Sequence, residues 1–300
     1  IELSNLGHQP MYSKKFNTVL SYNGEIYNHK KLRKMLDREV SIDWLSTSDT
    51  ETLLECLNNW GVDKTLSLID GMFAFAYWDR KNKNLILARD SFGEKPLYFG
   101  WLENSFLFAS ELGAFKNFDT FDDTINKEAL DNLFRFSYIP SPLTIFNNFF
   151  KLENGFYLKI NKLSKIKKIN IKKNNEINNK SFILKKWSDF KNKYENSINF
   201  PIENYETAKK KIKSNLFDSI ESRMLSDVEV GSLLSGGIDS SLVTAIMSKV
   251  AKGKIKTFNM GFENKKFDES QTSLEISNYL NTDHNKYIIT EKELINTSME

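Results

Sequence analysis

The first 110 residues alternate short apolar runs with turn residues, which is a pattern typical of β-strands. The runs between residues 17 and 110 read NTVLSY, GMFAFAYWD, NLILARD, PLYFGW and SFLFAS. In GMFAFAYWD both alternating sets of side chains are apolar, so both faces of this strand should be covered. We therefore predict layers of sheet packed on sheet, with helices outside.

Two helices should interrupt these strands. One follows Asn28, a residue type that can cap a helix, and continues through HKKLRKML. The other follows the acidic SDTE and should end at Gly61. In this second helix Cys56 recurs with Leu53 and Leu57 on one face. The only cysteine of the chain should therefore be a packing residue rather than a nucleophile.

After residue 204 the period of the pattern changes. YETAKKKIKSNLFDSIESRML repeats apolar positions four apart, which predicts an amphipathic helix. Strand-like and helix-like segments then alternate as EVGSLL, SLVTAIMSKV, KIKTFNMGF, SLEISNYL and NKYIIT, and TEKE resembles a capping box that opens one more helix. This alternation predicts βαβ units and a parallel sheet, which we expect to be cut short at Glu300.

The length of the chain favours two domains, because single cores stop growing well before 300 residues. Between residues 159 and 186 the composition shifts to Lys, Asn and Ile, with Glu176 as the only acid. This stretch lacks the aromatic interleaving typical of nucleic-acid contacts, so we interpret it as an irregular surface connection. We predict domains at 1–158 and 205–300, joined by residues 159–204.

Charge and composition exclude several classes of protein. The formal net charge is only +3, which does not favour nucleic acid as a partner. No apolar run is long enough to span a bilayer, and Ile1 does not open a signal peptide, so we expect a cytoplasmic protein without membrane contact. A single cysteine excludes internal disulfides and cysteine-based metal sites.

The segment GSLLSGGIDSS reads as a strand, a glycine loop and the start of a helix. Gly236 and Gly237 would let a phosphate approach the backbone N–H groups at the helix N-terminus. No lysine follows, so this is not the common P-loop, and Asp239 stands there instead. A carboxylate beside phosphates suits a magnesium ion that neutralises them. The alternative is a tight turn in which Asp239 only caps the helix.

SGGIDSS resembles the pyrophosphate loop of the ATP pyrophosphatases. The ordered series LSNLGHQPM, YNGEIYN, SDTETLLECLNNWG, LIDGMFAFAYWD, LARDSFGEKPLYFG and FASEL resembles the glutamine-dependent asparagine synthetases over almost the whole chain. The resemblance implies a mixed α/β and α+β protein of two domains. The first would be a class II glutaminase domain, an αββα sandwich of the Ntn-hydrolase type. The second would be a parallel-sheet α/β domain of the ATP pyrophosphatase type.

The resemblance also implies roles for particular residues. Asn23 and Gly24 would form an oxyanion hole and, with Glu25 and Asp49, would bind glutamine. Each has a structural alternative, because Asn-Gly is a good hairpin turn and Asp49 a good helix cap. In the second domain, the ATP-binding residues would be Leu234, Ser235, Gly236, Gly237, Asp239, Ser240 and Met260, with Asp239 as the magnesium ligand.

The implied activity is ATP-dependent amidation of aspartate through β-aspartyl-AMP, with ammonia from glutamine and with MgATP. The resemblance also allows a homodimer. The family's N-terminal cysteine nucleophile is not in this sequence, so we expect a fragment that lacks both ends. Two alternatives stay open: an amidotransferase for another acceptor, such as a sugar acid, and a non-catalytic binding module if the native chain starts at Ile1.

Overall fold

The computed structural model describes residues 2, 4–103, 105–161, 171–172, 175–226 and 228–299. The chain forms two compact units, Ile1–Phe200 and Pro201–Glu300. The first unit extends well beyond residue 158, and the predicted domain bounds 1–158 and 205–300 stay predictions.

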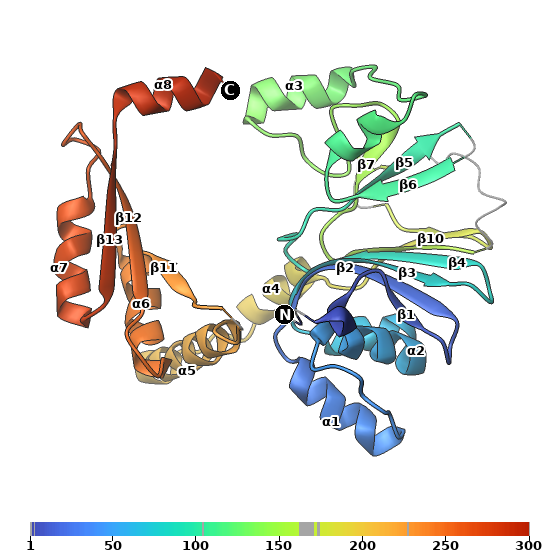
Figure 1. The fold of residues 1–300 in the computed structure, drawn as a ribbon, viewed down its shortest axis with the longest axis horizontal. Coiled ribbons are helices and arrows are strands. Elements are labelled where there is room, and N and C mark those ends of the chain that lie inside the picture. Colours follow the sequence, from blue (N-terminus) through green and yellow to red (C-terminus); the bar gives the residue numbers. More distant parts are fainter. Residues whose placement is uncertain are drawn as a thin grey trace. The chain divides into compact units, whose positions relative to one another are not determined.

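The first unit contains two antiparallel sheets (Figure 1). The larger sheet has seven strands in the order β1 (Met11–Ser13), β2 (Thr18–Ile26), β3 (Gly71–Asp79), β4 (Asn84–Arg89), β8 (Phe156–Ile160), β10 (Phe182–Lys186) and β9 (Ile177–Asn178). The smaller sheet has three strands in the order β6 (Ser105–Ala109), β5 (Tyr98–Leu102) and β7 (Phe149–Lys151). The strand segments between residues 17 and 110 were all predicted from the alternation.

Helices flank the pair of sheets. Helices α1 (His29–Glu39) and α2 (Asp49–Leu68) lie on the outer side of the larger sheet, and α3 (Lys127–Phe136) lies beyond the smaller one (Figure 1). The remaining helical segments of this unit are the 3₁₀ turns η1 (Asn5–Gly7) and η2 (Leu112–Asn117) and the helix α4 (Phe190–Ile198). The order of layers confirms the predicted αββα sandwich.

Strand β3 is covered on both faces, as its sequence predicts. Phe73, Phe75 and Tyr77 pack in one core cluster with leucines of α1 and α2. Ala74 and Ala76 point the other way, into a second cluster with aromatic side chains of the smaller sheet. Large side chains on one face and alanines on the other let the two sheets approach closely.

Both helices begin or break where the sequence predicts, and the structure adds one detail to each. The regular helix that begins at Asp49 is interrupted at Gly61, as predicted, because φ +73° and ψ 177° are not helical, and a second helical stretch within α2 then runs to Leu68. Asn28 occupies the N-cap position of α1, as predicted, but its side chain makes no capping hydrogen bond. Its amide instead donates to Leu68 O and accepts from Asp70 N, so it ties two distant segments together.

The prediction of an irregular connection at residues 159–186 was wrong for residues 159–160, 177–178 and 182–186, which lie in the strands β8, β9 and β10. Residues 182–186 form β10, which pairs antiparallel with β8 and buries Phe182 and Leu184 against the smaller sheet. A five-residue strand with two lysines at its end gives a weak local pattern, and the long-range pairing decided its structure. Residues 162–170, 173 and 174 of the predicted connection lie outside the described residues.

The second unit has a three-stranded parallel sheet, as predicted. Its strands are β11 (Gly231–Leu233), β12 (Lys256–Phe262) and β13 (Asp283–Ile289), in that order. Its helices are α5 (Tyr205–Arg223), α6 (Ile238–Val250), α7 (Ser270–Leu280) and α8 (Glu291–Met299). The capping box is confirmed, because Thr290 Oγ1 accepts from Glu293 N at 3.2 Å and Glu293 Oε2 accepts from Thr290 N at 2.8 Å.

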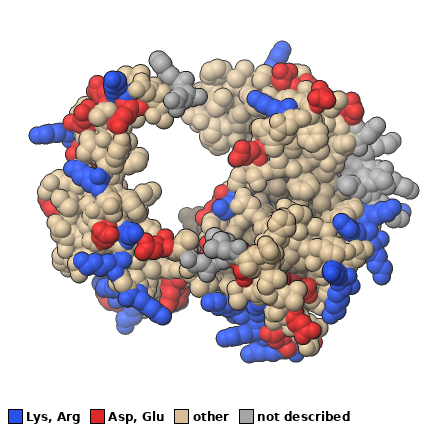
Figure 2. Space-filling view, in the orientation of Figure 1, with Lys and Arg blue, Asp and Glu red and all other residues tan. Residues whose placement is uncertain are grey.

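Charges of both signs are present on each unit on the face that Figure 2 shows. Within the described part of the chain, no helix has the length and apolar character needed to cross a membrane.

Cys56 lies fully buried on α2, in the core cluster beneath β3. Burial raises the pKa of its thiol to about 12. The thiolate is the reactive form of cysteine, so this residue has the character of a packing residue.

We expect a thiol reagent such as Ellman's reagent not to modify Cys56 in the native chain at pH 8, because the buried thiol stays protonated below its raised pKa. One equivalent should react once the chain is unfolded in guanidinium chloride. Fast stoichiometric labelling of the native chain, followed by absorbance, would contradict the packing role.

Candidate functional site

Asn23 and Gly24 lie in the middle of β2 rather than in a turn. Asn23 pairs with Ala74 and Gly24 with Phe73 in a continuous antiparallel register. The hairpin alternative for this Asn-Gly pair is therefore excluded.

The outer edge of β2 is open beyond the short strand β1. Pairing with β1 reaches only Leu20. Further along this edge, Tyr22 N donates to Gln9 Oε1 at 2.6 Å, and Ile26 N donates to Asp49 Oδ2 at 2.9 Å. Because N–H groups alternate between the two edges of a strand, Gly24 N points to the same edge. For Gly24 N the structure records no acceptor among the residues that it describes.

No larger residue fits at position 24. A Cβ there would lie 2.2 Å from Met72 O and 2.7 Å from Phe73 Cα, and the φ of Gly24 is +157°. The neighbouring strand is equally close at Gly71, where a Cβ would lie 2.1 Å from Glu25 O. The backbone of β2 and β3 thus requires glycine on both strands at this point.

Asn23 presents its side chain to the face of the sheet opposite that of Tyr22. It is exposed and lines a cavity of about 190 Å³ together with Ala74, Ala76 and Phe108. Asn23 and Gly24 therefore provide two adjacent donors, a side-chain amide and a free backbone N–H. Such a pair can stabilise an oxyanion.

Asp49 is held against the open edge of β2, although it comes from the start of α2. Ser48 caps this helix by accepting from Thr50 N, so Asp49 is not the cap. Its Oδ2 accepts from Ile26 N at 2.9 Å and from Tyr22 Oη at 2.8 Å. The structure thus brings Asp49 to the same strand edge as Gly24, and the capping alternative is excluded. Glu25 is partly buried on β2, opposite Met72.

The loop that precedes Asp49 is fixed by an arginine and a glutamate. Arg33 of α1 donates to Ser46 O and to Ser48 O, at 2.7 Å each. Glu51 accepts from Leu45 N and Ser46 N at 2.8 Å each, and lies 3.5 Å from the Arg33 guanidinium. These contacts fix the position at which α2 begins.

Arg89 and Asp90 are buried next to β3, and no role was assigned to them from the sequence. Asp90 is 1% exposed, and its carboxylate accepts from the backbone N–H groups of Phe73, Phe92, Glu94 and Lys95. Arg89 donates to the carbonyls of Gly93, Lys95 and Leu152. Asp90 therefore tethers Phe73, the residue paired with Gly24. Both residues lie in the motif LARDSFGEKPLYFG, which could have indicated their importance from the sequence.

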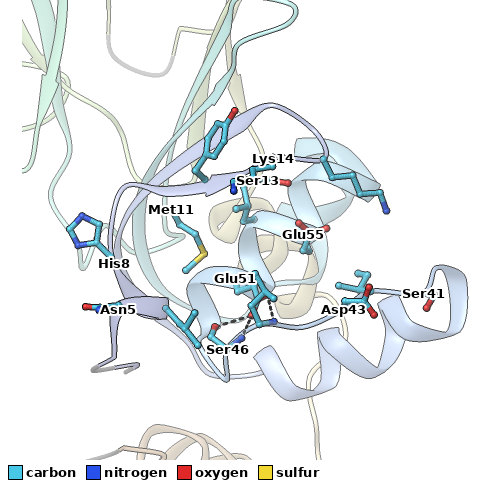
Figure 3. A pocket seen from close by; sticks show the side chains of 16 residues that line it. Asn5, His8, Met11, Ser13, Lys14, Ser41, Asp43, Ser46, Glu51 and Glu55 are labelled. Atoms are coloured by element: carbon cyan, nitrogen blue, oxygen red, sulfur yellow. Dashed lines mark hydrogen bonds between the residues drawn. The ribbon is translucent and has the colours of Figure 1, made fainter.

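A larger cavity of about 530 Å³ lies between residues 5–15, the loop 41–46 and α2 (Figure 3). Figure 3 shows Glu51 at its wall, hydrogen-bonded to Ser46. Its lining does not include Asn23, Gly24, Glu25 or Asp49, so it is distinct from the candidate site at the β2 edge.

The glycine loop of the second unit lies between β11 and α6, as predicted. Gly236 has φ +89°, and a Cβ there would lie 3.1 Å from Thr272 Cβ. Ser235 Oγ and Ser240 Oγ are 3.0 Å apart and close the loop across the start of the helix. Gly237 is the cap residue of α6, so the alternative role of Asp239 as cap is excluded.

The start of α6 suits an anion. For the N–H groups of Ile238, Asp239 and Ser240 the structure records no acceptor among the described residues. Free N–H groups at the start of a thirteen-residue helix attract phosphate. Asp239 is exposed beside them and could hold a cation, and no cluster of three metal-ligating side chains occurs in the described ranges. A magnesium ion there would have to take most of its ligands from phosphate and water.

Leu234 and Met260 do not share a face of the sheet. The side chain of Leu234 is 1% exposed and Met260 is 63% exposed. The Leu234 backbone is also engaged, because its N–H donates to Phe258 O and its carbonyl accepts from Asn259 Nδ2 at 3.0 Å. A shared role of Leu234 and Met260 in lining one ligand site stays a prediction, and Leu234 positions the loop through the core.

The chain therefore combines an αββα unit, which carries two adjacent N–H donors on β2, with a parallel α/β unit that has a glycine loop at a helix N-terminus. Residues 1–170 match the family model described as a glutamine amidotransferase domain, and residues 211–300 match the model described as asparagine synthase. The chain belongs to the glutamine amidotransferase domain family.

Curated relatives resemble the chain along almost its whole length. A protein of Methanocaldococcus jannaschii, provisionally named asparagine synthetase [glutamine-hydrolyzing] 2, is 32% identical over 98% of this chain and 55% of its own length. Asparagine synthetase [glutamine-hydrolyzing] 1 of Bacillus subtilis is 31% identical over 97% of this chain and 42% of its own length. The chain thus spans about half the length of the curated relatives that it matches.

Among solved structures, a glutamine phosphoribosylpyrophosphate amidotransferase from B. subtilis is similar with a TM-score of 0.40 and 13% identity. The match covers 94% of this chain and 49% of that structure.

From the close contact between β2 and β3 we predict the effect of a Cβ at position 24 on stability. Gly24→Ala should lower the free energy of unfolding by about 3 kcal/mol or more, because its Cβ would collide with the backbone of β3. Gly113→Ala is the matched control, since nothing lies within 4 Å of a Cβ at that position, and it should change stability by less than about 0.5 kcal/mol. Urea unfolding of both variants checks this, and equal stability would contradict the close approach.

Proposed function

We propose that the protein is a glutamine-dependent asparagine synthetase. Its first unit would release ammonia from glutamine, and its second unit would activate aspartate as β-aspartyl-AMP with ATP. Ammonia would then displace AMP to give asparagine. A cytoplasmic location and a homodimer stay predictions.

The observation that supports this proposal most is that one chain combines two sites of complementary chemistry. The free N–H of Gly24 lies on the open edge of β2, between two N–H groups that side chains already occupy. The second unit presents a glycine loop with free N–H groups at the start of α6. An oxyanion site suits amide hydrolysis, and an anion site at a helix start suits a nucleotide phosphate.

In the first unit, Asn23 and Gly24 would donate to the oxyanion of the tetrahedral intermediate. The carboxylate of Asp49, and that of Glu25, would bind the polar head of glutamine. The nucleophile would be the N-terminal cysteine that the family uses, which is not among these 300 residues. Cys56 cannot replace it, because its thiol is buried and its pKa is raised to about 12.

In the second unit, the loop from Ser235 to Ser240 would hold the phosphates of ATP against the start of α6. Asp239 would hold magnesium, which when bound would neutralise phosphate charge. Adenylation would convert a poor leaving oxygen of aspartate into a good one. Gly236 keeps the loop free of a Cβ where the phosphates would approach, and its φ of +89° favours glycine.

Asn23→Ala in the full-length protein should lower the turnover of glutamine by about two to three orders of magnitude, because one oxyanion donor is lost. Asparagine synthesis from added ammonia should persist. Glutamate and asparagine formation are measured on the same preparation. An equal loss of both activities would mean that Asn23 supports the fold rather than the intermediate.

Asp239→Asn should abolish most aspartate-dependent release of pyrophosphate from ATP, by about a hundredfold or more, because the charge that would hold magnesium is lost. Glutamine hydrolysis should remain. Asp218→Asn, an exposed carboxylate on α5, is the matched control and should be active. Near-normal pyrophosphate release by the Asp239 variant would refute the magnesium role, and cleavage of ATP to ADP by the unaltered protein would refute adenylation.

A further inference from the structure

Tyr22 connects the core of the first unit to the candidate glutamine site. Its hydroxyl donates to Asp49 Oδ2 at 2.8 Å, and the same oxygen accepts from Ile26 N at 2.9 Å. Two donors on one oxygen fix the rotation of the carboxylate. For Asp49 Oδ1 the structure records no hydrogen-bond partner among the described residues, so this oxygen is left for a ligand.

The tyrosine itself is held rigidly. Tyr22 is 8% exposed and packs in the core cluster with Phe73, Phe75 and leucines of α2. Its backbone is also fixed, because its N–H donates to Gln9 Oε1. Burial, and then the negative charge of Asp49, raise the pKa of the phenol, so the hydroxyl keeps its proton and stays a donor.

The kind of side chain that donates to Asp49 affects what its carboxylate can bind. A lysine or arginine at this position would orient the carboxylate but would also neutralise its charge. A neutral phenol orients the carboxylate without placing a positive charge in direct contact with it. This combination suits a cationic group such as the ammonium of an amino acid.

We propose that Tyr22 is a positioning residue for glutamine recognition, which directs Asp49 Oδ1 toward the ammonium group of the substrate. This inference rests on the proposed function, in which Asp49 binds glutamine. Tyr22 does not contact the reacting atoms, so it should affect substrate binding rather than the chemical step.

The test compares Tyr22→Phe with Tyr77→Phe in the full-length protein. Tyr77 lies on β3 in the same core cluster and is also 8% exposed, but its hydroxyl donates to Asn58 Oδ1, away from Asp49. Each variant loses one hydroxyl and one hydrogen bond from the same core. We expect Tyr22→Phe to raise the KM for glutamine about tenfold and to change kcat by less than about twofold. Tyr77→Phe should leave KM within about twofold of the unaltered protein.

Asp49→Asn and the double variant Tyr22→Phe/Asp49→Asn complete the experiment. If Tyr22 acts through Asp49, the second change should raise KM by less than about twofold once Asp49 is already altered. The inference is overturned if the two effects multiply, or if Tyr22→Phe leaves KM unchanged while Asp49→Asn raises it, and in both cases the proposed function stands. If Asp49→Asn itself leaves KM unchanged, the glutamine-binding role of Asp49 fails, and the role of Tyr22 fails with it.

Discussion

The candidate site of the first unit depends on a stretch of strand edge that no other strand covers. Pairing between β1 and β2 stops at Leu20, and the residue that precedes β1 is Pro10, which has no N–H group to extend the ladder. Side chains then replace the missing strand, because Gln9 accepts from one N–H and Asp49 from another. The N–H of Gly24 between them is left available on an open edge, where such groups usually pair with another strand or a ligand.

The open edge of β2 is held in place by contacts of β3 and by contacts of the loop before Asp49. Asp90 accepts from the N–H of Phe73 on β3 and from three N–H groups of the loop 92–95, and β3 lies too close to β2 for any side chain at Gly24. Arg33 fixes the loop before Asp49 through two backbone carbonyls. Buried charges of this kind require nearly complete hydrogen bonding, and here they obtain it from the backbone. Preorganised donors stabilise developing charge better than mobile ones, so a rigid frame is what the proposed role of Gly24 requires.

The second unit also has backbone N–H groups without an acceptor among the described residues, but in a different structural setting. Its free N–H groups come from a helix start rather than a strand edge, and Gly236 brings the chain into α6 with a positive φ. Asn259 ties the loop to β12 by donating to Leu234 O. Its Oδ1 is buried without a hydrogen-bond partner among the described atoms, so the amide is oriented by that single contact. Both units thus expose backbone N–H groups at places where regular secondary structure begins or is left unpaired.

The sequence by itself determined the strands between residues 17 and 110, the parallel βαβ unit and the residue types of both candidate sites, because these follow from local periodicity and short motifs. Tertiary structure alone decided the rest. Residues 182–186 became a strand through pairing with β8, a second helical stretch followed the break at Gly61, and Leu234 and Met260 were placed on opposite faces. The contacts of Asp49 with Tyr22 and Ile26 join residues more than twenty positions apart. Such contacts arise from packing between elements, and a local pattern holds no information about which distant edge a side chain will reach.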